Sequence, residues 1–236
     1  STREKAKKVL DTLRADNEDM KRVVEKILRA LKRTNERAEK LAREITEEIK
    51  RILKEVGVSE EALKEIEDTL KRVLEEIKRL LDESKKLLED VEREIREILK
   101  TSEELLERIE REIETVGSDE KTLAEILKRL LELNEEMNRR LLKILRDLLR
   151  LNEEVIRRLL AVLERLLDAL KEALDRGDVP EDRDHMVLHE YVNAAGITRK
   201  ALEELEREHR ELEKELDKLH DESRKEHERI EEELRR

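Results

Sequence analysis

The stretch KRILKEVGVSEEALKEI, residues 50–66, contains the signals that decide the fold. A run of residues with helical periodicity ends at Gly57, and a second such run begins just after Ser59. Glycine is favoured one residue past a helix because it adopts the left-handed conformation without steric cost. Serine is favoured immediately before a helix because its hydroxyl accepts a free backbone N–H. The stretch therefore predicts one helix that ends near residue 56 and another that starts near residue 59.

The same helix-ending glycine recurs at a regular interval along the chain. Gly57 is followed sixty residues later by Gly117, and Gly117 sixty residues later by Gly177. Further capping signals are Ser118 and Asp119 after the second glycine, Ser1 with Glu4 at the start, and Pro180 in the first turn of the last segment. These signals predict four helices, at about 2–56, 59–116, 119–176 and 180–236.

Short connections between long helices force neighbouring helices to run antiparallel. We therefore expect an all-α fold, an antiparallel up-down-up-down four-helix bundle of long, equal helices, in a single domain over residues 1–236. Equal lengths and repeated loop chemistry are typical of designed proteins, in which the backbone is idealised first.

The composition agrees with a helical bundle. Half of the residues are charged, Phe, Trp and Cys are absent, and there is one Tyr. So much charge also occurs in disordered chains. Here, however, Leu, Ile and Val recur at helical spacing throughout, which favours long packed helices.

Several functional classes find no support in the sequence. The net charge is −11, and there is neither a basic face nor an aromatic platform for nucleic acid. No apolar run has membrane-spanning length, and no secretory signal opens the chain, so we expect no membrane partner. The localisation is left open, although the chain is compatible with cytoplasmic expression. No phosphate-binding loop or nucleophile–base pair is present, so we expect neither an enzyme nor a cofactor.

Polar residues interrupt the apolar ladders of the predicted helices at matching heights. Isolated buried polar groups are costly, whereas clustered ones can satisfy one another and fix the helix register. We therefore predict two buried hydrogen-bond networks; the alternative is that these side chains face solvent beside a loose seam. One predicted group contains Asn17, Thr101, Ser102, Asn134, Asn138, His220 and Ser223, and the other contains Thr34, Ser84 and Asn152. The third helix also carries a near-repeat, LNEEM at 133–137 and LNEEV at 151–155, eighteen residues apart.

One segment differs in composition from the rest of the chain. It holds the only Tyr, the only Gly outside a predicted loop and two of the five His. Its sixteen residues are Arg183, Asp184, His185, Met186, Val187, Leu188, His189, Glu190, Tyr191, Val192, Asn193, Ala194, Ala195, Gly196, Ile197 and Thr198.

Without a gap, this segment resembles the eleventh β-strand of green fluorescent protein, in the form used as a complementation tag. The resemblance implies a partner, the complementary ten-stranded fragment, whose fluorescence the strand restores. It also implies that Glu190 would lie beside the chromophore of that barrel. The chromophore-forming residues are missing here, so the chain cannot fluoresce by itself.

The same residues also fit a helix. Leu188, Tyr191, Ala195 and Thr198 continue a heptad pattern into Leu202 and Leu205. Only by including this segment does the fourth helix match the length of the others. Gly196 and the β-branched residues oppose a helix, so burial against the other helices would have to override local preference. We predict that residues 183–198 are helical, with Leu188 and Tyr191 on the packed face.

By its general style, the chain resembles designed cage-and-latch switches, in which a bundle hides a peptide on its last helix. That resemblance implies a caging scaffold that releases the strand segment when the last helix detaches. The alternatives are a passive designed bundle with an inert tag, and an assembly with an added key helix or a second copy. The wide apolar stripe of the third helix, with pairs such as Leu141-Leu142, Leu148-Leu149, Leu159-Leu160 and Leu166-Leu167, favours an assembly.

The histidines suggest two further hypotheses. His209, His220 and His227 lie on or near the seam of the last helix, so a buried neutral ring that becomes charged would weaken the bundle. The alternative is that they are half-exposed polar positions. His185 and His189 have the spacing of two metal ligands on a helix, but they belong to the strand-like segment, and we expect no metal site.

Overall fold

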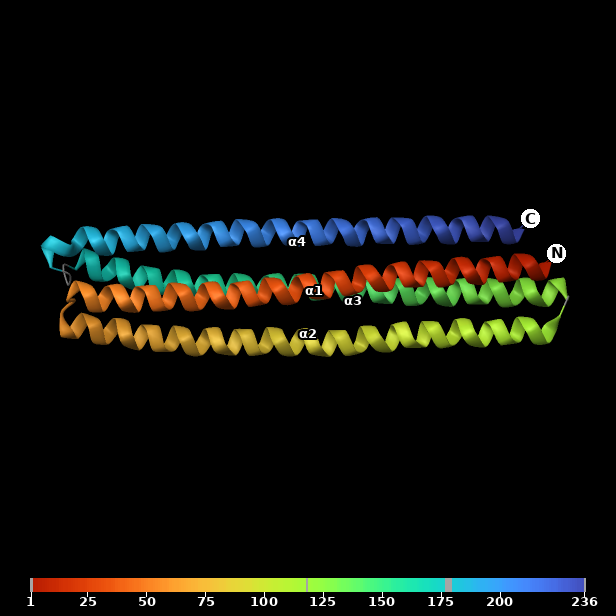
Figure 1. Ribbon diagram of the computed structural model, residues 1–236, viewed down its shortest axis with the longest axis horizontal. Helices are drawn as coiled ribbons and strands as arrows, with labels where there is room; N and C mark the ends of the chain where they lie inside the picture. The colour runs from red at the N-terminus through yellow and green to blue at the C-terminus, as the bar shows by residue number, and fades with distance from the viewer. Residues whose placement is uncertain (1, 118, 177–179, 236) are drawn as a thin grey trace. The chain divides into compact units, whose positions relative to one another are not determined.

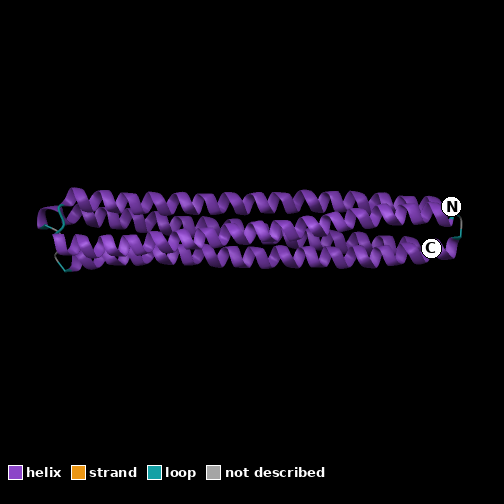
Figure 2. Ribbon diagram, turned by 90° about the horizontal axis from the view of Figure 1, so that it is seen from below, coloured by secondary structure: helices purple, strands orange, loops and turns teal. Residues whose placement is uncertain are grey.

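The computed structural model describes residues 2–117, 119–176 and 180–235. Within them, the α-helices are α1 (Thr2–Val56), α2 (Glu60–Val116), α3 (Glu120–Asp175) and α4 (Asp184–Arg235), and a short 3₁₀ helix, η1 (Glu181–Arg183), precedes α4. Successive helices run in opposite directions, as the colour gradient in Figure 1 shows. Figure 2 shows helices joined by short loops, with no strand among the described residues. The predicted all-α, antiparallel four-helix bundle is confirmed.

The turn between α1 and α2 forms as its sequence predicts. Gly57 has a φ of 72° and Gly117 a φ of 73°, both in the left-handed region that favours glycine. Ser59 caps α2, because its Oγ accepts the backbone N–H of Ala62 at 3.4 Å. The capping predictions for Ser1, Ser118 and Gly177 lie outside the described residues.

Contacts divide the chain into two compact units. The first unit comprises residues 1–30, 88–149 and 211–236, and the second comprises residues 31–87 and 150–210. Each unit takes a stretch from all four helices, so each contains its own four-helix core.

Both units bury an aliphatic core. In the first unit, Leu13, Leu123 and Leu130 are fully buried. In the second unit, Ile49, Leu163 and Leu170 are fully buried. The paired leucines of α3 that suggested an added helix or a second copy are all buried within the chain: Leu141, Leu142, Leu148, Leu149, Leu159, Leu160, Leu166 and Leu167. The width of this stripe is therefore accounted for by packing inside the two units.

Candidate functional site

The strand-like segment is helical in the structure. Residues 184–198 form the first four turns of α4, and Arg183 belongs to the preceding 3₁₀ turn. Arg183 also donates from Nη1 to the backbone carbonyl of Glu55, at 2.6 Å, which ties the start of this helix to the end of α1. The predicted helical conformation is confirmed for Asp184–Thr198, which leaves the question of how the helix is held.

The face of the segment that packs into the core of the second unit differs from the predicted one. Val187 is fully buried, and Glu190, Ala194 and Thr198 are buried with it, at helical spacings of three and four residues. Leu188 is 54% exposed, so its prediction as a packed residue was wrong. At this end of α4, the buried positions therefore lie one residue before the predicted ones.

Other residues of the segment complete the contact with the second core. Tyr191 and Ala195 are half-buried and pack against the core, as do Leu202 and Leu205 further along α4. Thr198 satisfies its buried hydroxyl by donating to the carbonyl of Ala194 at 2.8 Å. The packed face is therefore displaced by one residue from the predicted heptad through Ala194, and the two coincide at Thr198.

The segment fits its helical position poorly. The described part of the chain exposes six large apolar side chains, and four of them lie in this segment: Met186, Leu188, Val192 and Ile197. Val192, for example, is 60% exposed. The exposed face of a helix in a bundle normally carries polar residues. The apolar residues of this segment therefore do not match the face that α4 buries.

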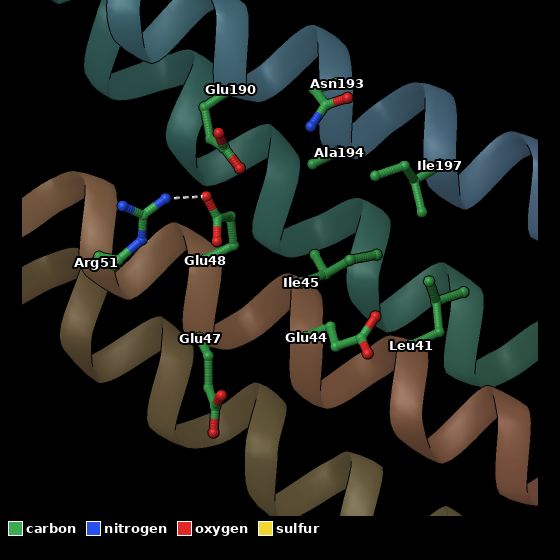
Figure 3. A pocket seen from close by; sticks show the side chains of 10 residues that line it. All are labelled: Leu41, Glu44, Ile45, Glu47, Glu48, Arg51, Glu190, Asn193, Ala194 and Ile197. Atoms are coloured by element: carbon green, nitrogen blue, oxygen red, sulfur yellow. Dashed lines mark hydrogen bonds and ion pairs between the residues drawn. The ribbon is translucent and has the colours of Figure 1, made fainter.

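The same mismatch places an acidic side chain on the packed face of α4. Glu190 is only 6% exposed, and it makes no hydrogen bond or ion pair with any residue that the structure describes. Its carboxylate points from α4 toward Glu48 of α1 (Figure 3). Burial raises the pKa of Glu190, the negative charge of Glu48 raises it further, and Arg51 partly opposes the shift.

The first polar network lies in the first unit and joins all four helices. Asn17 of α1 donates from Nδ2 to Ser102 Oγ of α2 at 3.0 Å, and to Asn134 Oδ1 of α3 at 3.2 Å. Asn134 Nδ2 in turn lies 3.1 Å from Nε2 of His227 on α4. A second bond between α3 and α4 runs from Asn138 Nδ2 to the hydroxyl of Ser223, at 3.3 Å.

The second polar network lies in the second unit and has the same four residue types. Asn35 of α1 donates to Ser84 Oγ of α2 at 2.6 Å, and Ser84 donates to Asn152 Oδ1 of α3 at 3.3 Å. Asn152 is fully buried, and its Nδ2 lies 3.4 Å from Nε2 of His209 on α4.

On every helix, the corresponding residues of the two networks are eighteen positions apart: Asn17 and Asn35, Ser84 and Ser102, Asn134 and Asn152, His209 and His227. Eighteen residues make five turns at 3.6 residues per turn, so both members of each pair share one helix face. The second network is therefore a repeat of the first, one copy in each unit.

The hydrogen-bond partners of the two network histidines fix the tautomer of each neutral ring. His209 Nδ1 lies 2.8 Å from the carbonyl of Leu205, and His227 Nδ1 lies 2.6 Å from the carbonyl of Ser223. A carbonyl only accepts, so Nδ1 carries the hydrogen in each ring, and Nε2 is left to accept from the asparagine amide. The pH response expected from the sequence for His209, His220 and His227 stays a prediction.

The structure corrects several of the predicted network residues. Thr101 is exposed and donates to the carbonyl of Glu97 in its own helix at 2.9 Å, and His220 is half-buried and belongs to neither network. Thr34 is buried as predicted, and it donates to Glu208 at 3.0 Å. The structure joins the other predicted residues across helices, in two separate networks: Asn17, Ser102, Asn134, Asn138 and Ser223 in the first unit, and Ser84 and Asn152 in the second.

Sequence reasoning missed Asn35, His209 and His227 as network members. The sequence predicted that the last two helices meet between residues 176 and 180, whereas α3 ends at Asp175 and the α-helical part of α4 begins at Asp184. The partners on α4 therefore lie about two helical turns further along than predicted. The eighteen-residue spacing is also present on the other helices. There it points to Asn35, His209 and His227.

Other kinds of site receive no support from the described residues. They contain no group of three or more His, Cys, Asp or Glu side chains placed to hold a metal ion, and His185 and His189 are exposed. No helix within the described ranges is long and apolar enough to cross a membrane. Comparisons with protein-family models, with curated proteins and with solved structures find no match to this chain. Any function must therefore be inferred from the residues and contacts themselves.

Proposed function

We propose that the chain is a designed caging scaffold, which holds residues 183–198 as a helix and releases them to complement a ten-stranded green fluorescent protein fragment. Two facts support this function: the segment resembles a β-strand in sequence, and it is a helix in α4. The single observation that carries it is that a segment patterned like a β-strand is helical and fits its helical position poorly.

The two conformations of the segment exclude one another. A strand that completes a barrel pairs its backbone N–H and C=O groups with neighbouring strands. In α4 the same groups are used within the helix, and Val187 and Ala194 are buried against the second core. The segment must therefore leave its place and unwind before it pairs, which makes release the controlling step.

The docked state is held by limited packing. Val187, Ala194 and the half-buried Tyr191 supply the apolar contact, while the buried carboxylate of Glu190 opposes docking. Apparent affinity for the fragment falls by the fraction of time for which the segment is free. A docking free energy of about 4 kcal/mol would leave roughly 0.1% of chains open, enough to suppress complementation while keeping release within reach.

Mixing the intact chain with the ten-stranded fragment tests the proposal. We expect fluorescence to grow much more slowly than with an equal concentration of a free peptide of residues 183–198. Equal rates would mean that nothing is caged and that the segment is a passive tag. A chain that gives no signal even when unfolded in denaturant and diluted into the fragment would show that the segment is not the proposed strand.

Two matched variants separate release of the segment from general destabilisation. Ile45 of α1 belongs to the core against which the segment packs, whereas Ile27, on the same helix, is buried in the first unit. Replacing either with alanine removes the same atoms and costs about 2–5 kcal/mol. We expect Ile45→Ala to accelerate complementation more than Ile27→Ala. The reverse order would contradict docking on the second core.

A further inference from the structure

A groove of about 480 Å³ lies between α1 and α4 in the second unit (Figure 3). One part of its lining is apolar, formed by Leu41 and Ile45 of α1 and by Ile197 of α4. Its volume falls within the range of small-molecule sites. Because both helices line the groove, it exists only while α4 is docked.

The polar part of the lining is predominantly acidic. Glu44, Glu47 and Glu48 of α1 line the groove together with Glu190 of α4, and Arg51 is the one basic residue in the lining. Glu44 and Glu47 are exposed at the rim, whereas Glu190 is buried.

The positive charge of Arg51 is already engaged. Its guanidinium pairs with Glu48 and also donates to Glu55 Oε1 at 3.3 Å. It forms no hydrogen bond or ion pair with Glu190, whose carboxylate faces Glu48 across the groove (Figure 3). The Glu190 side chain lines the groove and has no partner among the described residues, so a donor cation in the groove would make a strong, charge-assisted hydrogen bond with it.

The chemistry of the lining selects the kind of cation. The described residues offer no cluster of three or more ligands fit for a metal ion, which argues against a bare cation. An ammonium or guanidinium group would donate to Glu190, and a short alkyl chain would cover Leu41, Ile45 and Ile197. We propose that this groove binds an organic cation of that class, with Glu190 as its anchoring carboxylate.

Such a ligand would also act on release, a consequence that rests on the proposed caging function. Binding to the docked form alone lowers the open population by the factor 1 + [L]/Kd, about a hundredfold at one hundred times Kd. A cationic ligand in this groove is therefore expected to hold the segment closed.

The binding test uses n-hexylammonium as the probe and nuclear magnetic resonance of the full chain as the readout. We expect saturable shifts at Ala194 and Ile197, with a Kd near ~1 mM, a value ordinary for so small a ligand. Glu190→Gln keeps the shape of the side chain and removes its charge, and we expect it to weaken binding by about tenfold or more. Glu164→Gln, at an exposed position of α3 outside the groove, should leave binding unchanged.

Three results would overturn the site: no binding at roughly 10 mM probe, equal binding to Glu190→Gln, or equal binding of the neutral isostere hexanol. None of these readouts uses fluorescence, so they do not depend on caging. Conversely, if the probe binds as expected and yet complementation is not slowed, the site stands and the caging proposal is contradicted.

Discussion

We expect the substitution Gly196→Ala to stabilise the docked form of α4 by about 1 kcal/mol. Gly196 lies inside α4 on its exposed side, and, apart from its chain neighbours and the backbone of its own helical turns, a Cβ added there would have no atom within 4 Å. The added methyl group therefore meets no steric obstacle. Its effect comes from the conformational freedom that alanine lacks in the unfolded chain.

The expected gain carries over to release of the segment. One kcal/mol corresponds to about a fivefold change in a two-state equilibrium. Under the caging proposal, the open population and the initial rate of complementation should both fall by about that factor.

Two measurements check this prediction. The free energy of unfolding is obtained from denaturant titration followed by circular dichroism, and the release rate from the growth of fluorescence after mixing with the fragment. A free peptide that carries the same substitution serves as the reference, because alanine also changes the segment as a strand.

Gly117→Ala provides the matched control. Gly117 has a φ of 73°, where a Cβ is strained, so the same chemical change should destabilise the protein by about 1 kcal/mol. If Gly196→Ala left the unfolding free energy unchanged or lowered it, the helical state of this segment would be refuted. A loss of unfolding free energy in both variants would have the same meaning, because both glycines would then lie where alanine is disfavoured.

Three further predictions concern the polar residues. Burial raises the pKa of Asp16 from 3.8 to about 6, and its Oδ2 has no hydrogen-bond partner, so ionisation opposes folding and stability falls as the pH rises from 3.8 through 6. Asp16→Asn should therefore stabilise the protein at pH 7 by up to about 3 kcal/mol in chemical denaturation, and the gain should vanish below about pH 4. Asn152→Ala should cost about 2–4 kcal/mol, because it leaves two buried partners unsatisfied, whereas Thr101→Ala should be near neutral in the same assay. Glu48→Gln should move the pKa of Glu190 down toward its ordinary value, as followed by carbon NMR, and an unchanged titration would contradict the role given to Glu48.

Much of the fold could be predicted because its signals are local. Gly57 and Gly117 mark helix ends through their own backbone preferences, and the predicted ends at residues 56 and 116 agree with the structure. The start of α4 was predicted less well. Pro180 signals a helix, but the α-helical part begins only at Asp184, and the first turns fix which face is buried.

The candidate site could be predicted in kind but not in detail. Polar residues at core positions predicted that networks form. Which residues belong to each network depends on the register between α3 and α4, and the connection between those two helices sets that register. His220 and His227 differ by seven residues, two helical turns, and so share a helix face; only the register selects His227. The burial of Glu190 and the exposure of Leu188 could not be predicted, because Met186, Val187 and Leu188 are consecutive and helical periodicity alone does not say which of them is buried.

The most direct test of the account is the backbone conformation of residues 184–198 in the intact chain, read from Cα and carbonyl chemical shifts. The account predicts an unbroken run of helical shifts through Val187, Tyr191 and Gly196, which disappears when the ten-stranded fragment is added and fluorescence develops. Extended or random-coil shifts in the chain alone would contradict it, because the segment would then be ready to pair without any release.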